Sequence, residues 1–117
     1  METASRHISL LLLLSTFALA AASVLAIAPV EDLVILPHAL GHSAELWCAE
    51  RIQAYMSGKC KPQVCQCQTR SYYLCPDPRH GARWLGLVVT GDGKVITGFT
   101  ARREYWQKKI KNCLCMR

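Results

Sequence analysis

The sequence predicts a small disulfide-rich α+β domain, in which a short antiparallel sheet is followed by a carboxy-terminal amphipathic helix. Three observations predict this class. The chain has 117 residues, which allows one domain of modest size. It carries seven cysteines, all of them between positions 48 and 115. An apolar run at 85–90, a glycine-rich turn and an alternating segment at 94–100 precede a helical pattern, which is typical of a hairpin packed against a helix.

The amino terminus predicts a secretory signal peptide over residues 1–22. A short segment with Arg6 precedes an uncharged apolar run, and small residues that suit signal peptidase follow it. We expect cleavage after Ala20 or Ala22, so that the protein is secreted and extracellular. The alternative is an uncleaved anchor, because the apolar stretch 8–28 reaches the roughly 20 residues that span a bilayer. Its alanine-rich second half favours cleavage.

Residues 23–42 are expected to form an extended arm in front of a disulfide-rich domain over 43–117. The arm contains prolines and small apolar residues without a helical period, and only 33–36 is typical of a strand. A helix is then expected from Ser43, a suitable N-cap, to Gly58, a suitable stop. Its apolar residues recur at spacings of three and four: Trp47, Cys48, Ile52, Tyr55 and Met56.

The rest of the chain predicts strands and a second helix. Strand-favouring residues fill 59–78 and end at a Pro-Asp-Pro turn, which cannot continue a strand. The segments 85–90 and 94–100 flank Gly91-Asp92-Gly93 and predict a hairpin. Residues 101–112 predict an amphipathic helix whose apolar face is shared by Phe99, Trp106, Ile110 and Cys113.

The cysteines are expected to form disulfides, because a secreted chain meets an oxidising compartment. A zinc site at the two Cys-x-Cys pairs is the alternative, but structural zinc ligands are usually spaced by two to four residues. Each pair should therefore reach distant partners. The number is odd, so one cysteine is free or joins two copies in a disulfide-linked homodimer. Cys48 is the first candidate for that role; the full set is Cys48, Cys60, Cys65, Cys67, Cys75, Cys113 and Cys115.

Basic charge is concentrated in the second half of the chain. From position 58 onwards there are twelve Lys or Arg residues and three acidic ones, while 23–57 has one base and four acids. This segregation favours a cationic face that binds polyanions such as sulfated glycosaminoglycan, or an anionic membrane. The alternative is a solvated surface that keeps the protein soluble. Export makes nucleic acid an unsuitable partner.

No pattern in the sequence predicts catalysis. There is no phosphate-binding glycine-rich loop and no Gly-x-Ser-x-Gly nucleophile motif, and the histidines after the signal peptide are His38, His42 and His80. A Cys–His nucleophile is conceivable, but cysteines in such chains are usually crosslinked. We therefore expect a binding protein, not an enzyme, with no cofactor and no metal.

Two stretches resemble the chemokines. Cys65-Gln66-Cys67 resembles the Cys-x-Cys signature of one chemokine class, and 88–96 followed by 101–112 is similar to the last hairpin and helix of that fold. An alternative register matches Cys75-Pro76-Asp77-Pro78 and Trp84 to a Cys-x-Asp-Pro…Trp pattern. The resemblance implies a cytokine of the immune response whose flexible arm engages a cell-surface receptor. It also implies a heparin-binding set: Arg102, Arg103, Lys108, Lys109 and Lys111.

Two further hypotheses use the same features. The cysteine order from Cys60 to the terminal Cys113-x-Cys115 resembles the platelet-derived and vascular endothelial growth factors, which implies a cystine knot. Alternatively, the basic half with its tryptophans and tyrosines suits a cationic host-defence peptide at a membrane interface.

Overall fold

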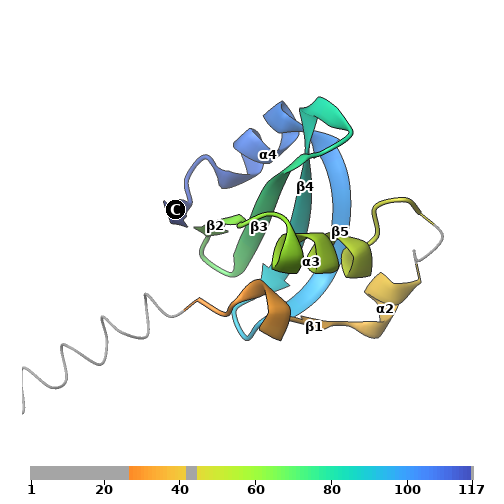
Figure 1. The fold of residues 1–117 in the computed structure, drawn as a ribbon. Coiled ribbons are helices and arrows are strands. Elements are labelled where there is room, and N and C mark those ends of the chain that lie inside the picture. The colour runs from red at the N-terminus through yellow and green to blue at the C-terminus, as the bar shows by residue number, and fades with distance from the viewer. Residues whose placement is uncertain (1–26, 42–44, 117) are drawn as a thin grey trace, which may run out of the picture.

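The computed structural model describes residues 27–41 and 45–116, so the expected signal peptide, Ser43 and His42 lie outside the described residues. The described chain is a small disulfide-rich α+β domain, as the sequence predicts, built on a six-stranded mixed sheet (Figure 1). Its strands are β1 (Val34–Ile35), β2 (Gln63–Gln66), β3 (Arg70–Asp77), β4 (His80–Thr90), β5 (Lys94–Arg102) and β6 (Leu114–Met116). Its helices are η1 (Val30–Asp32), α2 (Pro37–Leu40), α3 (Ala49–Gly58) and α4 (Arg103–Ile110). None of the described helices is long and apolar enough to cross a membrane.

The sheet is larger than the short antiparallel one that we expected. Its strand order is β1-β5-β4-β3-β2-β6, in which β2 to β5 form an antiparallel meander and β6 adds to the outer edge of β2. At the other edge β1 pairs with β5 in parallel, so the sheet is mixed. The expected helix over 101–112 corresponds to α4, but it does not end the fold, because β6 follows it.

The hairpin between β4 and β5 lies where the turn sequence predicts it. Gly93 has a φ of 82°, a left-handed conformation that glycine adopts without steric cost. Thr90 Oγ1 donates a hydrogen bond to the Asp92 carboxylate, and Lys94 lies 3.4 Å from the same side chain. Both contacts lower the pKa of Asp92, the bond from Thr90 most strongly. The turn is therefore closed by its own side chains.

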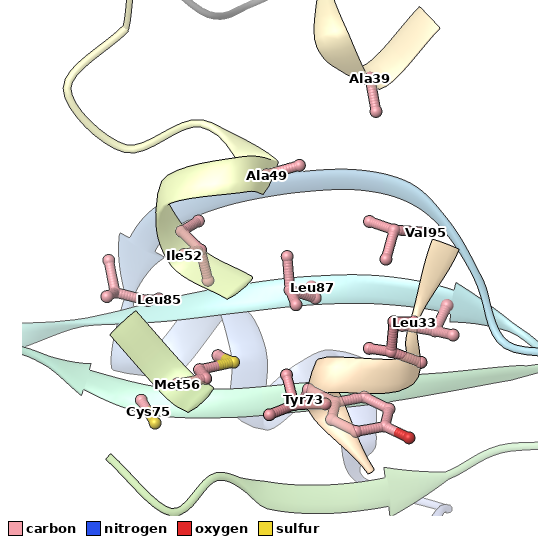
Figure 2. Close-up of a cluster of buried hydrophobic side chains, with 12 residues drawn as sticks. Leu33, Ala39, Ala49, Ile52, Met56, Tyr73, Cys75, Leu85, Leu87 and Val95 are labelled. Atoms are coloured by element: carbon pink, nitrogen blue, oxygen red, sulfur yellow. The ribbon is translucent and has the colours of Figure 1, made fainter. Parts of the chain in front are cut away.

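One face of the sheet is covered by α3, and the main core lies between them. Figure 2 shows Ile52 and Met56 of α3 beside Leu85 and Leu87 of β4, and all four side chains are buried. The helix approaches the sheet closely at Gly98, where an added Cβ would stand 2.8 Å from the Ala49 Cα. This close approach explains why a residue without a side chain occupies that point of β5.

The opposite face is covered by α4, which packs through Trp106. This side chain is 0% exposed and lies in a second cluster with Leu74 and Val88. An added Cβ at Gly86 would stand 2.4 Å from the indole ring, so the ring lies directly on the backbone of β4. Strand alternation separates the two clusters, because successive residues of β3 and β4 point to opposite faces. The sheet is therefore the middle layer of three.

The described part of the expected arm, residues 27–41, is folded onto the domain instead of extending from it. Val30, Leu33 and Ala39 are buried in the core of the α3 face. Gln53 Nε2 donates hydrogen bonds to the carbonyls of Val30 (2.9 Å) and Leu33 (2.8 Å). The Val30 carbonyl also accepts a hydrogen bond from the Leu33 N–H, so the bonds from Gln53 add a side-chain link between α3 and this segment. The strand predicted within 33–36 corresponds to β1, Val34–Ile35.

The hydroxyl of Tyr73 ties the first described residues to the sheet, because it donates a hydrogen bond to the Ala28 carbonyl. Burial raises the pKa of Tyr73, so the donor stays protonated at neutral pH. We expect Tyr73→Phe to lower the free energy of unfolding by about 1 kcal/mol, measured by denaturant titration, and to speed amide exchange around Ala28. This contribution is complete below pH 10, the ordinary range for tyrosine, and is lost as the pH rises through the raised pKa.

Tyr72→Phe is the matched control, since Tyr72 packs by its ring against Trp106 on the opposite face. Equal losses in the two variants would contradict the anchoring role of the Tyr73 hydroxyl.

The helix expected from Ser43 begins later than predicted. Ala49 is the first residue of α3 and Cys48 is its N-cap, while the helix ends at Gly58 as expected. Trp47 therefore precedes the helix instead of belonging to its apolar face, and its ring packs edge-on against Tyr55, with 5.7 Å between the ring centroids. Ile52 and Met56 do form the buried face.

Candidate polyanion-binding surface

Three disulfides fix the region that carries the basic residues. They join Cys60 to Cys75, Cys65 to Cys115 and Cys67 to Cys113. The prediction of disulfides is confirmed, and so is the expectation that each Cys-x-Cys pair reaches a distant partner. The two pairs face each other across the neighbouring strands β2 and β6. The segment after α4 is thus fastened to the sheet.

The disulfides do not form a cystine knot. A knot needs a ring of chain and two bridges that is wide enough for a third bridge to pass through. Here the ring closed by the two Cys-x-Cys pairs consists of adjacent hydrogen-bonded strands with no opening between them. The third bridge lies outside that ring, between β3 and the residues before β2. We therefore do not carry the growth-factor hypothesis further.

All seven cysteines lie in the described part of the chain, and Cys48 is the free one. It is the cysteine that the sequence predicts first for this role. Its side chain is 3% exposed at the amino-terminal end of α3. A thiol in this position reaches a second molecule only after the helix end opens. The fold therefore gives no support to a homodimer linked through Cys48.

The five predicted polyanion-binding residues lie on and beside α4, and all of them are exposed. We call them the basic surface: Arg102, Arg103, Lys108, Lys109 and Lys111. Arg102 ends β5 and immediately precedes the helix, while Lys111 follows its last residue. The one acidic residue within α4 is Glu104. Figure 1 shows α4 leading from the end of β5 towards the carboxy terminus beside β2.

Helical geometry distributes these charges around the exposed side of α4. At 100° per residue, Lys108 and Lys111 lie on the side opposite Trp106, and Arg103 and Lys109 flank the buried side. The flanking cations lie over aromatic rings: the Arg103 guanidinium is 5.5 Å from the Trp84 ring centroid. The Lys109 ammonium is 5.5 Å from the Tyr105 ring centroid. Such cation–π contacts hold the charges at the surface without neutralising them.

The structure adds three residues that the sequence analysis did not assign to the basic surface. Arg79 lies in the turn before β4, while His80 and Arg83 lie in its first part, and Arg83 is directly opposite Arg102 in the sheet. A short hairpin from β3 brings them there, with Asp77 paired to His80. The Pro-Asp-Pro sequence predicts only the end of a strand, whereas β3 continues through Pro76 to Asp77 and turns directly into β4. The register of this pairing and of β4 with β5 places Arg83 beside the end of β5. Arginine side chains therefore continue from α4 around the end of the sheet, where Asp77 and Glu45 lie beside them.

No protein-family model matches the chain, and neither the curated proteins nor the solved structures include a significant match. Among the residues that the structure describes, no three His, Cys, Asp or Glu side chains are grouped so that they could hold a metal ion. The arrangement is thus a cationic face on and beside α4, and electrostatic binding is the chemistry that it supports.

Proposed function

We propose that this protein is secreted and binds sulfated glycosaminoglycan at cell surfaces through the basic surface on α4. One observation carries the proposal: five exposed cations lie on or beside a two-turn helix that has one acidic residue. A single exposed charge binds weakly, because solvent and salt screen it. Several charges held together can bind a polyanion strongly, because the polymer releases many condensed counterions at once.

The anchoring of α4 supports the proposal. Its first residue continues β5, Trp106 fixes its middle to β4, and the disulfides fasten the chain after its last residue. The cations are therefore arranged before a ligand arrives. Pre-organised groups lose little entropy on binding, which favours affinity. The three disulfides are also compatible with the extracellular setting that the proposal requires.

The wider hypothesis is a chemokine-like cytokine that also binds a cell-surface receptor. In that hypothesis a flexible amino-terminal arm engages the receptor, whereas residues 27–41 pack on the core here. We therefore base the proposal on polyanion binding, and a receptor would have to contact another surface. The exposed Tyr105 beside Lys109 also suits an anionic membrane, so the host-defence alternative enters the experiment as a competing outcome.

Substituting two outward lysines tests where the polyanion binds. We expect Lys108→Gln with Lys111→Gln to weaken binding to a heparin chain about tenfold at low salt. The slope of log affinity against log salt should fall by about one for each lost ion pair. Isothermal titration at several salt concentrations measures both quantities.

Lys94→Gln is the matched control, because Lys94 is also exposed but lies in the β4–β5 turn, beside Asp92. Equal losses in the control and the double variant would place binding elsewhere. If anionic vesicles bind more tightly than heparin and are permeabilised, the host-defence hypothesis replaces this proposal.

A further inference from the structure

A small pocket opens at the end of the sheet where β4 begins and β5 ends. Its volume is about 270 Å³, slightly below the roughly 300–1,000 Å³ of sites for drug-sized ligands. We call it the end pocket, and its lining includes Trp47, Asp77, Arg79, His80, Arg83 and Thr100. It adjoins the basic surface, since Arg83 and Arg102 are direct neighbours across β4 and β5.

A hydrogen-bond network holds the polar wall of the end pocket in place. Asp77 is only 4% exposed, the one charged residue buried to that degree in the described chain. Its carboxylate accepts hydrogen bonds from the Thr100 hydroxyl (3.0 Å) and the Arg79 backbone N–H (2.9 Å). The Arg83 guanidinium donates to the Thr100 carbonyl at 2.9 Å. Both Asp77 oxygens are thus occupied, and Arg83 is positioned before any ligand binds.

The aromatic side of the pocket has an unpaired donor. The indole N–H of Trp47 is buried and has no hydrogen-bond partner among the described residues. Buried polar groups are nearly always paired, so an unpaired one is unusual in a folded protein. Because Trp47 also lines the end pocket, its indole signal reports on a ligand that binds there.

The charges of the lining decide which ligand fits. Arg79 and Arg83 are offset by Asp77 and Glu45, so the pocket combines both charges with hydroxyl and aromatic groups. A site for a bare inorganic anion would instead be lined by more positive than negative side chains. A sugar ring instead presents hydroxyl donors and acceptors, an apolar face and, when sulfated, an anionic group that suits arginine.

We propose that the end pocket holds one sugar ring of a sulfated polysaccharide, with its sulfate at Arg79 and Arg83 and its apolar face against Trp47. The inference rests on the proposed function and deepens it. The chain would continue along the basic surface, which supplies affinity, while the end pocket distinguishes a sulfated ring from other polyanions.

Tryptophan indole signals in ¹⁵N–¹H spectra of the full secreted protein test this inference. The probe is a sulfated hexosamine–uronate disaccharide, compared with its desulfated form and with inorganic sulfate. We expect the disaccharide to shift the Trp47 indole signal. The Trp106 signal should stay in place, since its N–H already donates to the Trp84 carbonyl at 2.9 Å. Neither of the other two probes should reproduce the shift.

A charge substitution in the pocket provides the second arm. We expect Arg79→Gln, at an exposed residue, to weaken disaccharide binding about tenfold, and Lys94→Gln to leave it unchanged. If long heparin chains bind but the disaccharide leaves Trp47 unmoved, the pocket assignment is overturned and the proposed function stands. If neither binds, the proposed function itself fails. Equal shifts with the desulfated sugar or inorganic sulfate also overturn the assignment.

Discussion

Removing both bridges between β2 and β6 is expected to lower the free energy of unfolding by about 6 kcal/mol, whereas removing either bridge alone should lower it by about 2 kcal/mol. The two bridges close sequence loops of 50 and 46 residues. In either single variant, the bridge that remains still closes nearly the whole loop. Closing this loop lowers the entropy of the unfolded chain, which stabilises the fold by about 4 kcal/mol. The other bridge adds only a small ring around Gln66 and Leu114.

The experiment compares three alanine variants by denaturant titration: Cys65 with Cys115, Cys67 with Cys113, and all four together. Alanine is the appropriate replacement because Cys65 is completely buried. A loss of about 6 kcal/mol approaches the whole stability of a typical small domain, so the four-residue variant should be largely unfolded. If the four-residue variant lost only the sum of the stabilities lost by the two double variants, the bridges would act independently, which would contradict their shared role.

Trp106→Ala is expected to cost about 3–5 kcal/mol of stability. The indole is fully buried, and it stacks on Phe99 with 4.8 Å between ring centroids. Its N–H also satisfies the Trp84 carbonyl. Truncation removes these contacts and leaves a cavity between α4 and the sheet. Because this side chain holds the middle of α4, heparin affinity should fall with stability even though no charge is lost.

Tyr105→Ala is the matched control, an aromatic on the same helix that is 41% exposed and should cost below about 1 kcal/mol. If Trp106→Ala fails to fold, Gly86→Ala tests the same contact from the sheet side. We expect it to cost about 1–3 kcal/mol, because its methyl group would overlap the indole. Gly81→Ala, with open space around it, should be neutral. Equal effects of the Trp106 and Tyr105 variants would show that α4 is not anchored as described.

Local sequence patterns predicted the parts of the fold that local interactions determine. The β4–β5 hairpin follows from a turn in which Gly93 takes a positive φ, and the burial of Trp106 follows from the spacing of apolar residues around it. The edge strands could not be predicted in this way. Leu114–Met116 has no alternating pattern, and two disulfides place it beside β2. Likewise, β1 is two residues long and depends on a parallel pairing with distant β5.

The same distinction applies to the sites. A run of lysines and arginines on a helix is visible in the sequence, and the structure leaves all five residues exposed. The end pocket is assembled from three separate segments, which contribute Trp47, Asp77 to Arg83, and Thr100. Only the sheet register brings Arg83 opposite Arg102. Residues 27–41 were expected to extend from the domain because their short apolar groups have no local period, yet Gln53 and the core hold them in place.

The most direct test of polyanion binding is a titration of the protein with heparan sulfate and with the same polysaccharide after chemical desulfation, at physiological salt. The proposed function predicts saturable binding to the sulfated chain that weakens as salt is raised, with no measurable binding to the desulfated chain. Absence of binding to the sulfated chain, or equal binding to both chains, would contradict it.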